Sequence, residues 1–350
     1  MRWQVFQLLS QMLGGQNLAA HIATASTLNL WPAVLTLSSY SLVTPNLYWS
    51  LSQDKTIWQS LPQDTQEYLS NIFELNTLRN ETILRETHRV IAALNAQNIR
   101  PFTLKNTGEL LNQRTPHIGY RMQTDIDLMV QPQELDKAYA IIQQLDYNIA
   151  QEQLGQHGPI LNRADNENIA NVEREYQHHQ HLAPLIKAGA AASVELHRHA
   201  YTPRFQKKFL LQTLFEQASS HNVDDLQFLT MSACQRQQHL VYHSYIGDGF
   251  QARSELPLRT ACDWLHTTNP RPQTFSDPQL TNFDALIKYL LLDEPSKLGA
   301  VNRQRKHIEL RHRSAIIGAL LAYCGKLKHG VINVMYNPQK LRKRLRLWFS

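Results

Sequence analysis

The segment from residue 101 to residue 130 constrains this chain most, because it combines an apolar strand pattern with a pair of acids. Its second half reads Arg-Met-Gln-Thr-Asp-Ile-Asp-Leu-Met-Val and places Asp125 and Asp127 two residues apart. Side chains at positions i and i+2 of a strand point to the same face. Two carboxylates on one face can bind divalent cations about 3.5–4 Å apart, the spacing of two-metal phosphoryl chemistry. The pair therefore predicts a metal site.

The first half of the segment predicts a seat for phosphate. It reads Pro-Phe-Thr-Leu-Lys-Asn-Thr-Gly, which we interpret as a strand over 101–105 that turns into a short helix over 107–113. Lys105 would end the strand, and lysine is a common phosphate ligand. The hydroxyl of Thr107 and the backbone amides around Gly108 would complete the seat. The alternative for Lys105 is an ordinary surface lysine.

A third acid follows on a later apolar strand, which reads Ser-Val-Glu-Leu-His. A carboxylate facing an apolar core is costly, so we expect Glu195 to face a cation, with an exposed strand face as the alternative. His197 lies two residues later and shares that face. Arg121 precedes Asp125 by four residues, so it would clamp phosphate or position the acceptor, with a loop-stabilising salt bridge as the alternative.

These pieces resemble the polymerase-β-type nucleotidyltransferases. More narrowly, they resemble the bacterial family of uncharacterised nucleotidyltransferases, over roughly residues 20–290. That family has an apolar strand ending in Lys-Gly, then Arg-x-x-x-Asp-hydrophobic-Asp, a helix, a His-rich loop and Glu-Leu-His. The matching pieces here are Leu104-Lys105, Arg121 with Asp125 and Asp127, the helix from Pro132, the histidines 178, 179 and 181, and Glu195-Leu196-His197. One position departs from the pattern, because Asn106 stands where the family has glycine.

The resemblance implies transfer of a nucleoside monophosphate from an NTP such as ATP to an acceptor hydroxyl, with release of pyrophosphate. The acceptor would be RNA, a protein or a small molecule. Mg²⁺ or Mn²⁺ would be held by the three acids, which would also be the catalytic residues. The implied site residues are the metal ligands Asp125, Asp127 and Glu195, the nucleotide-binding Lys105, Thr107, Gly108 and Arg121, and the substrate contacts His197 and His181. The alternative is a non-catalytic nucleotide- or partner-binding module on a degenerate nucleotidyltransferase fold.

The fold class that we predict is α+β, with a small mixed β-sheet of polymerase-β-like type between two helical regions. The helical region over 1–98 would include one long amphipathic helix, or two, over 62–97. The catalytic core would cover 99–204, and a second helical region with a basic tail would cover 205–350. Within the core, the polar and aperiodic stretch 151–177 predicts a mobile loop or an insertion. Within the last region, we predict a helix over 225–246 that carries His239 and His243.

Charge and composition bear on partners and compartment. The segment 303–350 holds twelve Lys and Arg residues against one acid, Glu309. This charge favours an anionic partner such as RNA or a phosphorylated substrate, with a solvated helix face as the alternative. Residues 22–53 carry no charge, but prolines 32 and 45 interrupt them, so we predict buried helices and no membrane segment.

Three scattered cysteines and no signal-peptide pattern predict a cytoplasmic protein. The chain contains neither a Gly-x-x-x-x-Gly-Lys-Ser/Thr loop nor Gly-x-Gly-x-x-Gly.

Overall fold

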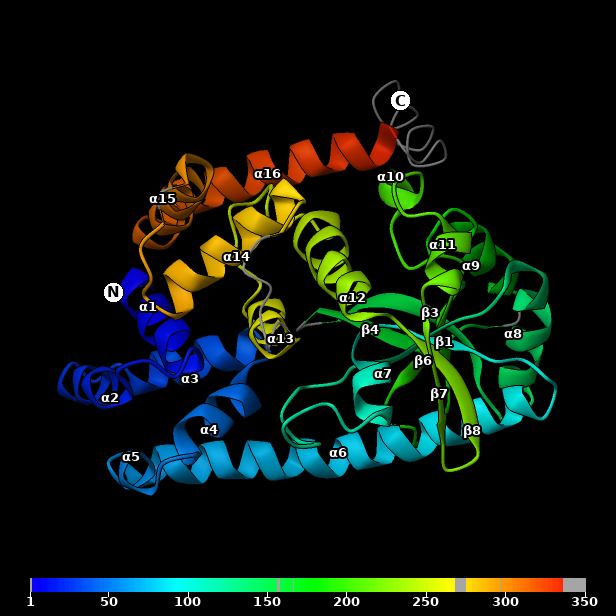
Figure 1. The fold of residues 1–350 in the computed structure, drawn as a ribbon, viewed down its shortest axis with the longest axis horizontal. Helices are drawn as coiled ribbons and strands as arrows, with labels where there is room; N and C mark the ends of the chain where they lie inside the picture. The colour runs from blue at the N-terminus through cyan, green and yellow to red at the C-terminus, as the bar shows by residue number, and fades with distance from the viewer. Residues whose placement is uncertain (1, 156–157, 166, 268–274, 297, 336–350) are drawn as a thin grey trace. The chain divides into compact units, whose positions relative to one another are not determined.

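A computed structural model describes residues 2–335, apart from 156–157, 166, 268–274 and 297 (Figure 1). It has mixed α+β architecture with an eight-stranded sheet, as predicted in outline. The chain divides into two compact units. The helical unit is made by the described residues of 1–78, 119–122 and 240–332, and the sheet unit by those of 79–118, 123–239 and 333–350.

The sheet unit contains all the strands that the described residues form. They are β1 (Phe102–Thr103), β2 (Asp125–Met129), β3 (Asn148–Gly155), β4 (Gly158–Arg163), β5 (Leu185–Ile186), β6 (Ser193–His197), β7 (Ser219–Val223) and β8 (Leu226–Thr230). Their order across the sheet is β4-β3-β5-β6-β2-β1-β8-β7. The pairs β2–β6 and β1–β8 are parallel and the other pairs antiparallel, so the sheet is mixed.

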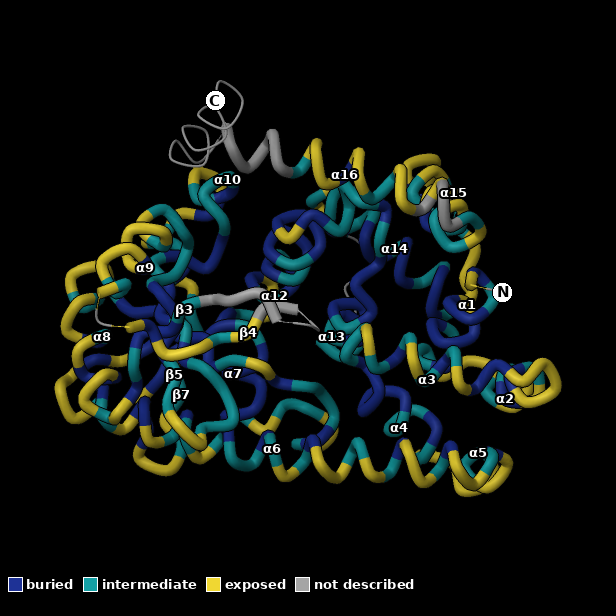
Figure 2. The backbone as a smooth tube through the Cα atoms, turned by 180° about the vertical axis from the view of Figure 1, so that it is seen from behind, coloured by how far each residue is buried: buried dark blue, intermediate teal, exposed yellow. Residues whose placement is uncertain are grey.

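Helices cover the sheet within the same unit. They are α7 (Lys105–Leu111), η1 (Pro132–Glu134), α8 (Leu135–Gln143), α9 (Ile169–Tyr176), α10 (Pro203–Gln206), α11 (Leu211–Glu216), α12 (Ala233–His239) and the second half of α6 (Gln63–Asn95). Helix α6 confirms the long amphipathic helix that the sequence predicts. One side of this helix is buried and the other exposed along its length (Figure 2).

The core of the sheet unit lies between α6, α8 and the central strands. Alternate residues of β2 and β6 enter it together with apolar side chains of the two helices, namely Ile126, Leu128, Val194, Leu196, Ile83, Val90, Ile91, Leu94 and Ile142. Because side chains alternate across a strand, the remaining residues of β2 and β6 project from the opposite face. That second face carries the acids discussed below.

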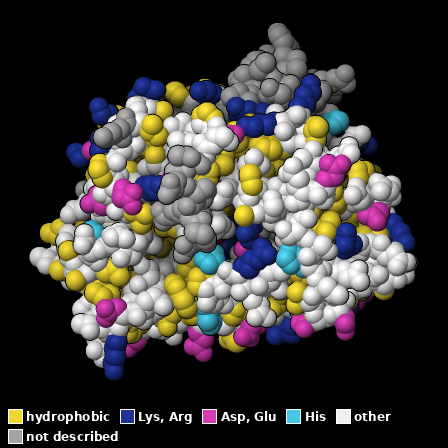
Figure 3. All heavy atoms as spheres, viewed as in Figure 1, with side chains coloured by type: hydrophobic (Ala, Val, Ile, Leu, Met, Phe, Trp, Pro, Cys, Tyr) yellow, Lys and Arg dark blue, Asp and Glu magenta, His cyan; other side chains and the backbone are white. Residues whose placement is uncertain are grey.

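The helical unit is built from short helices and the first half of α6. They are α1 (Arg2–Leu13), α2 (Leu18–Thr27), α3 (Trp31–Tyr40), α4 (Thr44–Ser52), α5 (Lys55–Gln59), η2 (Leu240–Gly247), α13 (Leu258–Thr267), α14 (Pro278–Leu291), α15 (Gly299–Arg313) and α16 (Ala315–Met335). Pro32 and Pro45 stand in the first turns of α3 and α4, where proline is tolerated. Lys and Arg side chains gather along α15 and α16 (Figure 3).

No helix among the described residues combines the length and apolar character needed to cross a membrane. The last residues of the predicted basic tail, 336–350, lie outside the described residues.

The helix predicted over 225–246 is wrong in its first part, where the chain forms a β-hairpin. Strands β7 and β8 pair with Val223 opposite Leu226, which leaves a two-residue turn of Asp224 and Asp225. Their φ angles of 47° and 64° are both positive, as a type I′ turn requires. The helix begins only at Ala233, and His239 and His243 fall in α12 and the π-helical η2.

The loop predicted over 151–177 is also wrong. Strand β3 continues to Gly155, and its residues from Ala150 onward pair with the whole of β4, from Ala150 opposite Arg163 to Gly155 opposite Gly158. Helix α9 then follows. Asn, Gln and Glu are poor strand formers, so backbone pairing at this edge of the sheet overrides their local preference.

Candidate active site and metal centre

The register of two parallel strands brings the predicted acids onto one face of the sheet. Asp127 lies opposite Glu195, and Met129 lies opposite His197. Asp125, Asp127, Glu195 and His197 therefore share the face that points away from the apolar core. Within each strand, the alternation of side chains puts these residues on one face. The register between β2 and β6 then brings the two sets together, and no local sequence pattern encodes that register.

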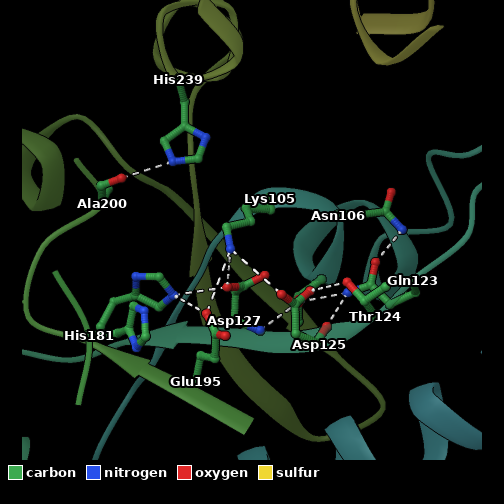
Figure 4. A network of polar contacts seen from close by, with 12 residues as sticks. Lys105, Asn106, Gln123, Thr124, Asp125, Asp127, His181, Glu195, Ala200 and His239 are labelled. Atoms are coloured by element: carbon green, nitrogen blue, oxygen red, sulfur yellow. Dashed lines mark hydrogen bonds and ion pairs between the residues drawn. The ribbon is translucent and has the colours of Figure 1, made fainter. Parts of the chain in front are cut away.

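Lys105 extends into this group of acids from the first residue of α7 (Figure 4). Its Nζ lies 2.6 Å from Asp127 Oδ1, and 3.8 Å from both Asp125 Oδ2 and Glu195 Oε2. The backbone of Lys105 has a φ of 50°, a left-handed conformation that is strained for a residue with a side chain. Local strain of this kind is concentrated at functional sites, and here it directs the lysine toward the acids.

Burial and charge set the protonation of this group. Burial alone would raise the pKa of Asp127, but Lys105 and His197 lower it below its usual range. Burial likewise opposes ionisation of Glu195, yet a hydrogen bond from His197 and the charge of Lys105 lower its pKa to about 2. The pKa of Lys105 is raised, because the three acids outweigh its own desolvation. Lysine and these two acids are therefore charged at neutral pH.

His197 is the fifth member of the group. Its side chain is 1% exposed, and its Nε2 lies 2.9 Å from Asp127 Oδ1 and 3.5 Å from Glu195 Oε2. Burial would lower the pKa of His197, but these two acids raise it overall. The ring of His181 lies 5.3 Å from the ring of His197, and its Nδ1 lies 2.7 Å from the carbonyl oxygen of Leu182. Burial lowers the pKa of His181.

The donor set fits a divalent cation. The Asp127 side chain is fully buried, and its Oδ1 accepts hydrogen bonds from Lys105 and His197. Its Oδ2 has no hydrogen-bond donor among the described residues. A buried carboxylate oxygen without a protein donor leaves a position that a water or a cation can fill. Asp127, Glu195 and His197 each offer a ligand atom, and these atoms lie within 4.8 Å of one another. This group has His197 where the sequence analysis expected Asp125.

Residues of the predicted phosphate seat make packing contacts in this structure, and their role in phosphate binding stays a prediction. The Thr107 hydroxyl accepts the backbone N–H of Asp127 at 3.0 Å, which fixes α7 on β2. A Cβ on Gly108 would meet Thr103 Oγ1 at 2.7 Å, so this glycine allows α7 to approach the strand. The side chain of Asn106 is buried and donates to Gln123 Oε1 at 2.9 Å. The left-handed residue is Lys105 and not Asn106, so the missing family glycine does not strain the turn.

Arg121 belongs to the helical unit. Its Nε donates to both carboxylate oxygens of Asp263, at 2.8 and 2.9 Å. The loop that carries it is fixed by Asn76, whose Nδ2 donates to the carbonyl oxygens of Gly119 and Arg121. In this structure Arg121 makes the salt bridge that the sequence analysis held as the alternative to phosphate binding.

Arg79 is a residue that sequence reasoning missed. From α6 its guanidinium donates to the carbonyl oxygens of Gln123 and Ala191, which lie two residues before β2 and β6 respectively. It thereby holds together the starts of the two strands that carry the acids. Arg79 looks like any exposed helix position in the sequence, so no local pattern predicts this contact.

The comparison with known protein families supports the interpretation of these motifs. The family model described as uncharacterised nucleotidyltransferase matches residues 28–280, which is well over half of the chain. No curated protein matches it in sequence. The match spans β2, β6 and Lys105, and it confirms the resemblance inferred from the motifs. The chain therefore belongs to the uncharacterised nucleotidyltransferase family.

Proposed function

We propose that this protein is a metal-dependent nucleotidyltransferase with a polymerase-β-like core, which transfers a nucleoside monophosphate from an NTP to an acceptor hydroxyl. One observation carries the proposal. Three carboxylates and one lysine converge on one face of β2 and β6, and a buried oxygen of Asp127 lacks a donor among the described residues. Family membership supports the reaction class.

In this proposal Asp125, Asp127 and Glu195 hold Mg²⁺ or Mn²⁺. When bound, the cation neutralises the triphosphate and activates the acceptor hydroxyl. The acceptor oxygen attacks the α-phosphorus, the bond to the β-phosphate oxygen breaks, and pyrophosphate leaves. The pKa of Glu195, lowered to about 2, suits a ligand better than a general base, so the hydroxyl proton passes to solvent. Lys105 then moves from Asp127 to the leaving phosphates.

A second candidate is a non-catalytic binding module. Lys105 already provides a positive charge to the three acids, as a cation would. Thr107 and Gly108 are used in packing, which leaves fewer groups for phosphate than the sequence predicts. In this alternative the lysine stabilises the acids permanently and no nucleotide is turned over.

The test uses each α-labelled NTP with Mg²⁺ or Mn²⁺, together with total RNA, lysate protein or small-molecule extract. Wild type is compared with Asp125→Asn, with Asp127→Asn and with the control Asp136→Asn, which changes an exposed acid on α8. The proposal expects label transfer by wild type and the control, and a loss of at least about 100-fold in the two site variants. If no label moves and calorimetry finds no metal-dependent NTP binding, the binding-module alternative replaces it.

For the acceptor we favour RNA, because basic side chains of α15 and α16 form an exposed cationic surface. Its exposed members are Arg303, Lys306, Arg313, Lys326 and Lys328. If RNA binds here, the logarithm of its binding constant should fall linearly with the logarithm of the salt concentration. We expect Arg303→Glu combined with Lys306→Glu to lower RNA affinity and flatten the salt dependence, while NTP binding is unchanged. Equal RNA affinity in wild type and variant would overturn this assignment.

A further inference from the structure

We propose that the cation site uses a nitrogen ligand, the imidazole Nε2 of His197, beside carboxylate oxygens of Asp127 and Glu195. This mixed site prefers Mn²⁺ and similar transition ions to Mg²⁺. The inference rests on the proposed function for the role of the cation, and it adds the identity of one ligand and the kind of metal. It differs from the all-carboxylate set of Asp125, Asp127 and Glu195 that the motifs predict.

The separations between ligand atoms carry the first step. Atoms bound side by side at about 2.1 Å from an octahedral ion lie about 3 Å apart. His197 Nε2 lies 2.9 Å from Asp127 Oδ1 and 3.5 Å from Glu195 Oε2, close to that spacing. Among the described residues this is the one group of three His, Cys, Asp or Glu side chains with ligand atoms this close together. Asp125 stands outside it.

Burial carries the second step. The side chains of Asp127 and His197 are 0% and 1% exposed, and their strands are in direct register. Neither side chain can turn toward solvent when a cation arrives. Lys105, in contrast, is 23% exposed on a long and flexible side chain, so it is the group that can withdraw. A cation that binds Asp127 and Glu195 therefore meets His197, and the proton that Nε2 donates to Asp127 Oδ1 in this structure passes to solvent when the imidazole binds the cation.

The chemistry of imidazole carries the third step. Mg²⁺ is bound in proteins by oxygen ligands and water. Imidazole nitrogen suits later first-row ions, whose affinity for nitrogen and oxygen sites rises from Mn²⁺ to Zn²⁺. One nitrogen among two carboxylates therefore shifts the preference of the site away from Mg²⁺ without excluding it.

The experiment detects the nitrogen directly. Mn²⁺ is titrated into the full-length, metal-stripped protein, and binding is followed by loss of the free Mn²⁺ signal in electron paramagnetic resonance. Pulsed measurements on the bound ion then show whether a histidine nitrogen couples to it, and protein labelled with ¹⁵N-histidine identifies that nitrogen. His197→Gln keeps an amide nitrogen near the position of Nε2 but removes the imidazole. His181→Gln is the matched control, because it removes the neighbouring ring instead.

We expect wild type and His181→Gln to bind one Mn²⁺ with a histidine nitrogen coupling, and His197→Gln to lose the coupling and about tenfold or more in Mn²⁺ affinity. We also expect Mg²⁺ to displace Mn²⁺ more readily from His197→Gln than from wild type. Mn²⁺ bound without histidine coupling, or coupling retained in His197→Gln, overturns this inference and leaves the proposed function intact. Absence of Mn²⁺ binding overturns this inference, whereas the proposed function falls only if the labelled-NTP assay and the calorimetry described above also fail. If His197→Gln does not fold, two other samples decide. The ¹⁵N-labelled wild type should show the histidine coupling, and Asp127→Asn should lose it. Coupling that persists in Asp127→Asn would place the ion at another site and overturn the inference.

Discussion

The ammonium of Lys105 lies 2.6 Å from Asp127 Oδ1, so one lysine side chain acts as the counter-charge of a fully buried carboxylate. The same ammonium is within 3.8 Å of Asp125 and Glu195. Burying a carboxylate is expensive unless a cation accompanies it. This lysine therefore links the stability of the sheet unit to the charge state of its candidate active site.

Lys105→Met should make the stability of the protein depend on divalent cations. Removing one partner of a buried ion pair costs about 3–5 kcal/mol, and we expect about 2–3 kcal/mol here because the lysine side chain is 23% exposed. Added Mn²⁺ should restore part of this loss by binding the native state. The measurement is urea unfolding with chelator and with Mn²⁺, with the exposed Lys207→Met as control. Equal stability of variant and wild type in chelator would contradict the counter-charge role.

Glu195 should contribute stability that is lost in acid. Its pKa of about 2 in the folded protein lies below the ordinary value of about 4.3, so its contribution is present above about pH 4.3 and disappears as pH falls toward 2. The size is roughly 3 kcal/mol. We expect Glu195→Gln to show a flatter loss of unfolding free energy between pH 5 and pH 2 than wild type, measured in chelator. The exposed Glu74→Gln should follow wild type. Parallel curves for wild type and Glu195→Gln would show that the carboxylate is not stabilised.

The sequence was enough to predict that the two acids share one face of their strand, because this depends only on the alternation of side chains along a single strand. Asp125 and Asp127 carry that information themselves, as do Glu195 and His197. The contact between Asp127 and His197 was not predictable, because it depends on the register between β2 and β6, which is set by core packing of Ile126, Leu128 and their neighbours.

Two other features escaped prediction for different physical reasons. The hairpin around Asp224 and Asp225 depends on two left-handed residues other than glycine, which local preference disfavours. The packing contacts of Thr107 and Gly108 depend on how α7 lies on the sheet, which the sequence does not give, and their predicted role in nucleotide binding stays a prediction. In both cases tertiary contacts decide between alternatives that the sequence leaves open.

Arg79→Met should disturb the site without touching an acid. Its guanidinium donates to the carbonyl oxygens that precede β2 and β6, and hydrogen bonds from charged donors contribute about 1.5–3 kcal/mol each. We expect about 2–3 kcal/mol lower unfolding stability and weaker Mn²⁺ binding, with partial recovery in Arg79→Lys. Calorimetric melting and Mn²⁺ titration provide the two readouts. The control is Arg85→Met, an exposed arginine of the same helix, which should resemble wild type. Unchanged Mn²⁺ affinity in Arg79→Met would show that the strand starts align without it.

Gly108→Ala separates the packing role of this glycine from a role in phosphate binding. The added Cβ would lie 2.7 Å from Thr103 Oγ1 and 3.1 Å from Thr230 Cγ2, so either these buried threonine side chains or α7 must shift. Overpacking of this kind costs about 1–3 kcal/mol, which urea unfolding measures. Gly299→Ala is the matched control, since its added Cβ meets nothing closer than Arg303 Nη1 at 3.7 Å, and it should be neutral or slightly stabilising. A Gly108→Ala protein with wild-type stability but weaker NTP binding would instead assign this glycine to the nucleotide.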